Sequence, residues 1–353
     1  MASVYFYIAS IIILVSLLPY VRSQHWVFRV FEFARLQLTV LQVLAVLLGL
    51  ILQKDYPSHL IVQGILGILV LVNTLKLIKY SPWYPTTKIT LKNPSEEIAV
   101  LSVNVYQYNT DYSKFIDLVK ETQPDIILTM ESNRDWEEAM SALTDDYPNY
   151  HFESLENTYG MHFFTKLEMH DVCTHFFIAD DVPSMEIELS TPDGIQFKMF
   201  GVHPPPPSPS EEETSKERDG ELLCVARKIS ETNRAVIVVG DFNSVAWSRP
   251  SYLFRKTSGL LDARIGRGFI STFHANFWWF RFPIDLFFHS SSVEVNELKT
   301  LSPIGSDHLP LYCQFKVGND DVENRDPQLT KQEKEEVQEM IIDGKTETGN
   351  RER

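Results

Sequence analysis

The sequence has few cysteines, and their placement excludes several classes of protein. Its 353 residues include three, Cys173, Cys224 and Cys313, which are widely spaced and form no C-x-x-C pair. A disulfide scaffold needs paired cysteines, and a structural zinc site needs thiolates or imidazoles at short, regular spacing. We therefore interpret the three cysteines as small apolar residues.

Several well-known catalytic signatures are also absent. The sequence contains no glycine-rich P-loop, no G-x-G-x-x-G nucleotide fingerprint, no H-E-x-x-H zinc motif and no G-x-S-x-G elbow. The P-loop holds nucleotide phosphates, and the G-x-S-x-G elbow presents the serine nucleophile of many hydrolases. The sequence therefore contains no motif that supports nucleotide-driven chemistry or a serine hydrolase.

Basic residues are scarce relative to acidic ones. The chain has 32 lysines and arginines against 47 aspartates and glutamates, for a net charge of −15. Residues 1–92 carry +6 and residues 318–353 carry −5, so residues 93–317 carry −16. Tight non-specific binding to nucleic acid relies on Lys and Arg that neutralise phosphates. Residues 93–317 lack that basic footprint as a whole, while a local basic patch stays open.

Long apolar runs, by contrast, fill the first eighty residues. Residues 4–21, 36–52 and 59–78 contain almost no charge, and each is long enough to cross a hydrocarbon core of ~30 Å. Three such runs in succession are unusual for the core of a globular domain, and the first lacks the basic start and cleavage site of a signal peptide. We therefore predict three transmembrane helices in a membrane anchor over residues 1–80.

The charges between the apolar runs predict an orientation. The first connection carries Arg22, Arg29 and Arg35, and four lysines follow within and after the third run. The start of the chain has no charged side chain, and the second connection has one lysine and one aspartate. By the positive-inside rule, the part of the chain after residue 80 is cytoplasmic. We expect an integral membrane protein of the cell membrane, bound to lipid through its helices.

The pattern of apolar and polar residues changes after the three apolar runs. Residues 81–96 form a proline-punctuated linker, and short β-rich runs then alternate with amphipathic stretches over residues 97–317. This alternation predicts a separate α/β catalytic domain. Residues 318–353 are polar and dense in charge, so we expect a disordered tail, with a helix over residues 329–341 as the alternative.

Polar residues stand where apolar runs of this domain end. Asn104 ends the run over residues 98–104, Glu131 follows "DIILTM", and Asp241 and Asn243 follow "VIVV". Each alone has an ordinary interpretation: a buried asparagine that holds a turn, a solvated glutamate, or a Gly-Asp-Asn turn. Their recurrence in the same kind of place indicates a site at the ends of several strands.

Two further acids and two histidines follow the same pattern. Asp285 lies inside the apolar "FPIDLFF", Asp307 and His308 lead into a final strand, and His203 ends "FKMFGV". A buried aspartate without a partner is costly, so we expect a histidine or a cation beside Asp285. For each histidine alone, a structural hydrogen-bonding role is the ordinary interpretation.

These residue types together suit the cleavage of a phosphoester. Hard divalent cations such as Mg²⁺ prefer carboxylate oxygens and keep several waters. Histidines beside acids supply a general base and a general acid, and asparagine amides orient a phosphate as its charge develops. The set therefore predicts metal-assisted hydrolysis.

Seven blocks in order resemble one known superfamily. They are "LSVNV", "TMESN", "YGMHFFTK", "GVHPP", "VVGDFNS", "PIDLFFHS" and "GSDHLP", spread over about residues 97–316. They resemble the endonuclease/exonuclease/phosphatase superfamily, which includes deoxyribonucleases, abasic-site endonucleases, neutral sphingomyelinases and inositol-polyphosphate phosphatases. The apolar start suggests its membrane-anchored bacterial type. The resemblance implies an α/β four-layer sandwich, in which two packed β-sheets are flanked by helices.

The resemblance also implies a metal site. Glu131 is the principal ligand of Mg²⁺, with Mn²⁺ as an alternative ion. Asn104 supports this glutamate or binds the phosphate, and Asp307 lies close to the metal.

Catalytic roles carry over in the same way. Asp241 orients or deprotonates the attacking water, and Asn243 holds a phosphoryl oxygen. His308 contacts the scissile phosphate or acts as a base, oriented by Asp285. His203 matches the general acid of the deoxyribonuclease and sphingomyelinase branches.

The sequence leaves the substrate open among three hypotheses. The first is a membrane-anchored phosphoesterase that acts on a lipid headgroup or a small phosphorylated molecule, favoured by the anchor and the −16 charge. The second is a Mg²⁺-dependent nuclease on DNA or RNA, which that charge disfavours. The third is an inactive membrane scaffold, which the complete set of acids and histidines disfavours. The aromatic run over residues 273–283 fits a substrate-facing or membrane-facing loop as well as the edge of a core strand. The oligomeric state is undetermined.

Overall fold

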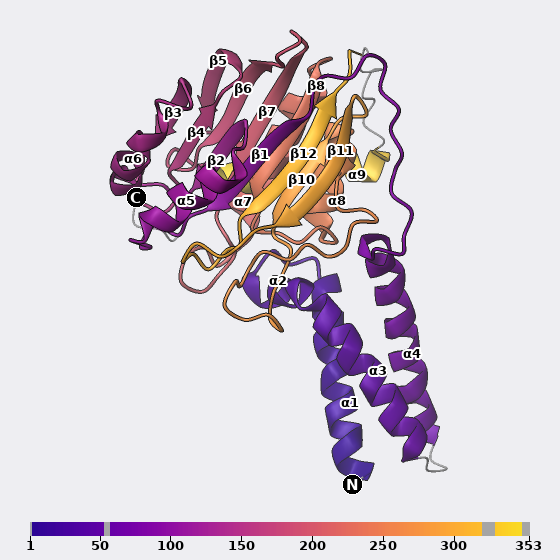
Figure 1. Ribbon diagram of the computed structural model, residues 1–353. Helices are drawn as coiled ribbons and strands as arrows, with labels where there is room; N and C mark the ends of the chain where they lie inside the picture. Colours follow the sequence, from indigo (N-terminus) through magenta and orange to yellow (C-terminus); the bar gives the residue numbers. More distant parts are fainter. Residues whose placement is uncertain (1, 53–56, 320–328, 348–353) are drawn as a thin grey trace.

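The computed structural model of the protein describes residues 2–52, 57–319 and 329–347 (Figure 1). The apolar runs form α1 (Ala2–Leu17), α3 (Arg35–Ile51) and α4 (Pro57–Leu77), and one-turn helices η1 (Leu18–Tyr20) and η2 (Ile78–Tyr80) follow α1 and α4. These runs are rich in leucine, isoleucine and valine and have no proline inside the helix, so nothing interrupts their hydrogen bonds. The three helices project together from one side of the remaining structure (Figure 1).

The predicted count of three transmembrane helices is not confirmed. Among the described residues, Ser58–Tyr80 is by itself long and apolar enough to cross a membrane. The first connection forms a further helix, α2 (Trp26–Phe33), and α2 and α3 meet that criterion only as a pair bent by 74°. The remaining apolar helix, Val4–Tyr20, is shorter. Membrane insertion as a whole therefore stays a prediction.

Two mixed six-stranded sheets make up the centre of the domain. The first sheet has the order β11-β12-β1-β2-β4-β3, and the second has the order β5-β6-β7-β8-β10-β9. The strands of the first sheet are β1 (Ile98–Asn104), β2 (Ile126–Met130), β3 (Asn149–Glu153), β4 (Met161–Thr165), β11 (Val293–Thr300) and β12 (Leu311–Val317). Those of the second are β5 (Glu168–His175), β6 (Ser184–Ser190), β7 (Gln196–Val202), β8 (Ala235–Asp241), β9 (Leu261–Asp262) and β10 (Asp285–His289).

The two sheets pack face to face, as predicted. Side chains from both, such as Leu128 and Phe315 in the first and Met199 and Ile237 in the second, form one buried core between them. The central strands β1, β2 and β8 are buried on both faces, which explains why they read as unbroken apolar runs rather than as alternating ones.

Helices cover the outer face of each sheet and complete the predicted four layers. On the first sheet lie α5 (Tyr112–Thr122), α6 (Arg134–Met140) and η3 (Ser141–Leu143), and on the second lie α7 (Lys216–Ser230) and α8 (Arg249–Ser258). The amphipathic face predicted for α5 buries Phe115 and Val119. This helix ends at Gln123 in the left-handed conformation, directly before Pro124.

Residues 331–346 of the predicted tail form α9 (Lys331–Thr346), so the alternative of a helix in this region is confirmed and the prediction of disorder is wrong for these residues. Thr330 and Glu333 form a capping box at its start. Val337 and Ile341 pack on Leu223 of α7 and on α8. Two apolar residues four positions apart thus secure a helix whose composition otherwise reads as disordered. Residues 320–328 and 348–353 of the predicted tail lie outside the described residues.

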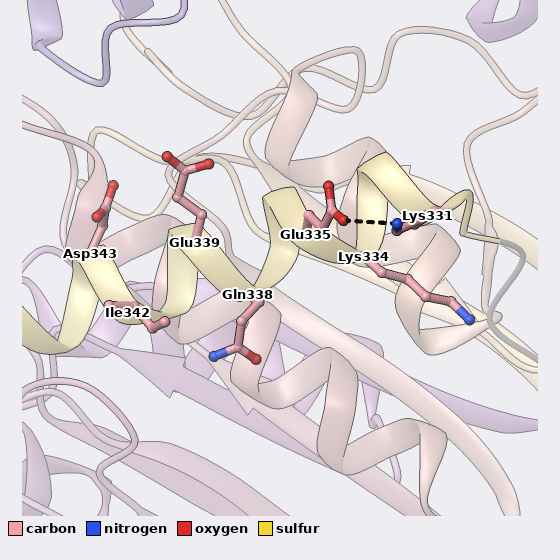
Figure 2. Close-up of a pocket in the computed structure, with 7 residues that line it drawn as sticks. All are labelled: Lys331, Lys334, Glu335, Gln338, Glu339, Ile342 and Asp343. Carbon is pink, nitrogen blue, oxygen red and sulfur yellow. Dashed lines mark ion pairs between the residues drawn. The ribbon is translucent and has the colours of Figure 1, made fainter.

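The outer face of α9 carries the charges that dominated its composition (Figure 2). Lys331 and Glu335 form an ion pair of 3.9 Å between two largely exposed side chains, which stabilises the helix little. The shallow hollow along this face contains none of the predicted site residues; its lining is Lys331, Lys334, Glu335, Gln338, Glu339, Ile342 and Asp343.

A pair of neighbouring isoleucines tests whether α9 is part of the folded domain. Ile341 is 4% exposed and Ile342 is 50% exposed. Ile341→Ala should lower the free energy of unfolding by about 2–4 kcal/mol, because it leaves a cavity against α7. Urea unfolding of the full chain in detergent, followed by tryptophan fluorescence, measures the change. The matched control Ile342→Ala should shift it by about 0.5 kcal/mol or less; equal midpoints for the two variants would show that α9 is not docked.

Candidate active site

Strand pairing gathers four of the predicted site residues at one end of the sandwich. β1 and β2 run parallel, so Asn104 at the end of β1 lies near Glu131, which follows β2. In the other sheet β10 runs antiparallel to β8, and Asp285 lies directly opposite Asp241. The two sheets meet at this point: the backbone N–H of Asp241 donates to Sδ of Met130 (3.1 Å), and Nδ2 of Asn104 donates to Oδ2 of Asp241 (3.3 Å).

The turn after β8 depends on one glycine. Gly240 has φ of +146°, and a Cβ at this position would lie 2.1 Å from the carbonyl oxygen of Val202. Only glycine fits so close to the neighbouring strand. Asn243 then adopts the left-handed conformation (φ +46°), and its backbone N–H donates to Oδ1 of Asp241 (2.8 Å). Nδ2 of Asn243 donates to the carbonyl of Pro204 (2.9 Å), so its predicted contact with a phosphoryl oxygen stays a prediction.

His308 lies between the two facing aspartates. Its Nδ1 is 2.8 Å from Oδ2 of Asp285, and its Nε2 is 3.5 Å from Oδ2 of Asp241. All three side chains are buried. Burial by itself lowers the pKa of His308, but the two carboxylates outweigh burial and raise that pKa. Burial raises the pKa of Asp241, and the positive charge of His308 opposes that rise.

The second predicted histidine joins the same cluster at longer range. Nε2 of His203 is 3.9 Å from Oδ2 of Asp241, and its ring lies 5.5 Å from the ring of Tyr159. Burial lowers the pKa of His203 to about 3, and the positive charge of His308 adds to this effect. The predicted role as a general acid needs the protonated imidazole, a form that the negative charge of a bound phosphate would favour.

Glu131 lies beside this cluster, and it is more accessible to solvent than the buried Asp241 and His308. Its Oε1 accepts a hydrogen bond from Nδ2 of Asn104 (2.8 Å), and its Oε2 accepts one from the backbone N–H of Gln107 (3.2 Å). Burial raises the pKa of Glu131, and the negative charge of Asp307 contributes to the rise. Two carboxylates thus lie close enough to repel each other, an arrangement that a divalent cation relieves.

The donor atoms fit a hard divalent cation. Glu131 and Asp307 offer carboxylate oxygens, which Mg²⁺ and Mn²⁺ prefer. The ligand atoms of Asp241, Asp285 and His308 also lie within 4.8 Å of one another. In that group Nδ1 of His308 is engaged by Asp285, so Nε2 is the ring nitrogen that would face a cation. The role of Glu131 as the principal ligand, which the family resemblance implies, stays a prediction.

Three residues that the sequence did not single out support the site. Arg218 of α7 is buried, donates to Oδ1 of Asp219 (2.7 Å) and donates from Nη1 to the carbonyl of Asn243 (2.9 Å). Ser306 donates to the carbonyl of Asn104 (2.7 Å), and Gln107 binds Glu131 as described. A charged run on a helix is ordinarily solvated, so "SKERDG" carries no signal that marks Arg218 as buried.

The N-terminal helices pack directly on the loops that carry the site. The backbone carbonyl of Glu32 in α2 accepts a hydrogen bond from Nε1 of Trp247 (2.7 Å), and the hydroxyl of Tyr80 donates to the carbonyl of Ala246 (3.1 Å). The ring of Phe33 contacts that of Phe282 (5.9 Å). These contacts hold the turn that follows Asn243 and the segment that leads into Asp285 against the N-terminal helices.

Residues 101–308 match the Endonuclease/Exonuclease/phosphatase family, and this span is more than half of the chain. The chain belongs to this family. It is therefore a metal-dependent hydrolase of phosphoester bonds. No curated protein matches it.

Solved structures share the fold at low sequence identity. TDP2 of D. rerio, humanized by 14 mutations, has a TM-score of 0.52 at 15% identity, covering 63% of this chain and 99% of that chain. An endonuclease/exonuclease/phosphatase family protein from Bacteroides thetaiotaomicron has 0.52 at 19%, covering 64% and 99%. The catalytic domain of human Nocturnin with bound sulfate has 0.51 at 18%, covering 65% and 97%.

The pair of Asp285 and His308 yields a test of the hydrolase. Asp285→Asn keeps the size of the side chain but removes the charge that orients and polarises His308. We expect kcat for bis-p-nitrophenyl phosphate with Mg²⁺ to fall by about 10²-fold or more. His170→Gln, at an exposed histidine on β5, is the control and should retain full activity. A less than fivefold effect of Asp285→Asn would remove this pair from the catalytic set.

Arg218 is a positioning residue in our interpretation, and a double substitution separates this role from stability. Arg218→Met alone leaves Asp219 buried without its partner, which costs about 3–5 kcal/mol. Arg218→Met with Asp219→Asn removes both charges and should recover most of that stability. Its kcat should still fall by about tenfold or more, since the carbonyl of Asn243 loses its donor. Recovery of activity together with stability would show a purely structural role.

Proposed function

We propose that this protein is a membrane-anchored phosphoesterase that hydrolyses the phosphoester of a lipid headgroup or of a small phosphorylated molecule. In this proposal three transmembrane helices place the catalytic domain on the cytoplasmic side of a bacterial cell membrane. One observation carries it: the helices that would lie in the membrane pack on the loops that carry Asn243 and Asp285.

The surface of the N-terminal helices supports insertion in a bilayer. Tyr7, Ile51, Leu60 and Leu75 are 69%, 79%, 73% and 65% exposed, and many aliphatic neighbours are similarly exposed. An exposed apolar surface of this extent marks contact with lipid or protein. The helix α3 has 17 residues, which is at the lower end of the ~17–25 residues that span a bilayer.

Polar side chains join the three helices on their inner faces. Nε2 of Gln42 donates to Oγ of Ser16 (2.7 Å), and Nδ2 of Asn73 donates to Oε1 of Gln42 (3.2 Å). Arg35 donates to Oδ1 of Asn73 (2.7 Å). Membrane helices place their few polar residues in this way, towards one another and away from lipid.

The site residues then act on a phosphoester as follows. Asp241 orients a water molecule and accepts one of its protons. The oxygen of the water bonds to phosphorus, the bond from phosphorus to the leaving oxygen breaks, and the protonated imidazole of His203, the general acid of this proposal, gives that oxygen a proton. His308, held by Asp285, presents Nε2 on the side of Asp241 and binds a phosphoryl oxygen. A divalent cation bound at Glu131 would withdraw negative charge from the phosphoryl group.

A nuclease is the second candidate, and one comparison favours it. A D. rerio TDP2 structure complexed with a single-strand DNA product has a TM-score of 0.52 with this chain at 16% identity. The charge of −16 over residues 93–317 argues against it, because an acidic domain repels the phosphates of a polynucleotide.

The purified full chain in detergent separates these candidates. It would receive Mg²⁺ or Mn²⁺ and, in parallel, bis-p-nitrophenyl phosphate, sphingomyelin, phosphatidylinositol phosphates and plasmid DNA. We expect turnover of a lipid or small phosphoester at a kcat/KM at least about tenfold above that for plasmid DNA, and loss of all turnover with EDTA. Asp285→Asn is the control for a contaminating enzyme.

Two results would contradict the proposal. Faster cleavage of plasmid DNA than of any lipid or small ester would favour the nuclease. Release of the full chain from membranes by an alkaline wash would contradict the anchor.

A further inference from the structure

An exposed group of aromatic side chains lies in the loop between β9 and β10. Phe277, Trp278, Trp279 and Phe280 are 48%, 82%, 61% and 43% exposed, and we call them the aromatic tip. Exposing this much aromatic surface to water is unfavourable at about 25 cal/mol per Å² of apolar area. Their exposure argues against the alternative that this run is the edge of a core strand.

The base of this loop is attached to the catalytic residues. The backbone N–H of Ala275 donates to the carbonyl of Asp307 (2.6 Å). The ring of Phe273 lies 5.0 Å from the ring of His308. The aromatic tip is therefore only a few residues away from Phe273 and Ala275, which contact His308 and Asp307. A surface that contacts the tip would also lie next to the site.

The same loop is attached to the start of the apolar helices. Nε2 of Gln37, in the first turn of α3, donates to the carbonyl of Trp279 (3.4 Å). Phe282 contacts Phe33, the last residue of α2. Trp83, which follows the last apolar helix, is 87% exposed. The loops between β9 and β10 lie on the side of the sandwich from which α1, α3 and α4 project (Figure 1).

We propose that the aromatic tip inserts into the bilayer surface and that the adjoining site acts on phosphoesters carried by membrane lipids. This proposal rests on the proposed function, since it needs the anchor and the hydrolase. Trp and Phe are suited to the interface between headgroups and acyl chains. Residues 93–317 carry a net negative charge, so anionic lipids repel this domain. We therefore expect it to bind the bilayer through uncharged aromatic rings and not through a basic patch.

Docking is measured without reference to activity. The full chain is reconstituted in vesicles of phosphatidylcholine with brominated acyl chains, which quench tryptophan fluorescence on contact. Trp278→Ala with Trp279→Ala should remove a large part of the quenched emission, and quenching of the wild type should persist at high salt. Tyr150→Ala, at an exposed residue of the edge strand β3, should leave quenching unchanged. Equal quenching of the wild type and the double variant, or its loss in salt, overturns insertion of the tip.

The substrate class is tested with the same preparations. The double variant should hydrolyse soluble bis-p-nitrophenyl phosphate within twofold of the wild type but lose about tenfold of its rate on sphingomyelin or phosphatidylinositol 4-phosphate in vesicles. An equal loss on both kinds of substrate would show that the tip only supports the site, and overturns the proposal. Absence of turnover on any phosphoester would instead refute the proposed function, and the quenching would then still report on docking.

Discussion

The buried contact of His308 with Asp285 and Asp241 is the interaction on which the site depends. The register of β8 and β10 sets the two carboxylates directly opposite each other, where like charges repel. The imidazole lies between them and relieves this repulsion. Because His308 comes from the loop before β12 in the other sheet, the contact also joins the two sheets at their catalytic end. Asn104 adds a second link between the sheets through Asp241.

The N-terminal helices and the two-sheet domain are in direct contact, although a proline-containing segment connects them in the sequence. Glu32 of α2 forms a buried ion pair with Arg29; burial raises the pKa of Glu32, and the charges of Arg29 and Arg218 oppose that rise. Arg218 in turn holds the turn at Asn243. The hydrogen bond from Nε1 of Trp247 to the carbonyl of Glu32 makes a second connection from α2 to the segment that follows Asn243. A displacement of α2 would therefore also move the turn that carries Asn243.

Much of the fold and of the site could be predicted from the sequence, because the strands that form the buried core are also visible locally as apolar runs. The buried strands gave unbroken apolar runs, and each predicted site residue stood at the end of one or close to it. The aromatic run was ambiguous, since rings occur in cores and at interfaces alike. The features that the sequence left open or missed depend on tertiary packing: α9 packs through Val337 and Ile341 and through ion pairs of Glu333 and Glu336 with α8, and Arg218 is buried where Asp219 and the carbonyl of Asn243 accept its hydrogen bonds. No local pattern encodes such partners.

The way the loop before β10 is fixed has a consequence for how this enzyme diversifies. Its two ends are held by backbone hydrogen bonds, from Thr272 to the carbonyl of Phe282 and from Leu309 to that of Thr272, while the tip between them is free to change. Insertions and deletions at the tip therefore leave Asp285 in register with Asp241, whereas a shift of one residue within β10 would turn Asp285 to the opposite face of the sheet. The side chains at the tip and the register that sets the catalytic pair are therefore determined by separate parts of the same loop.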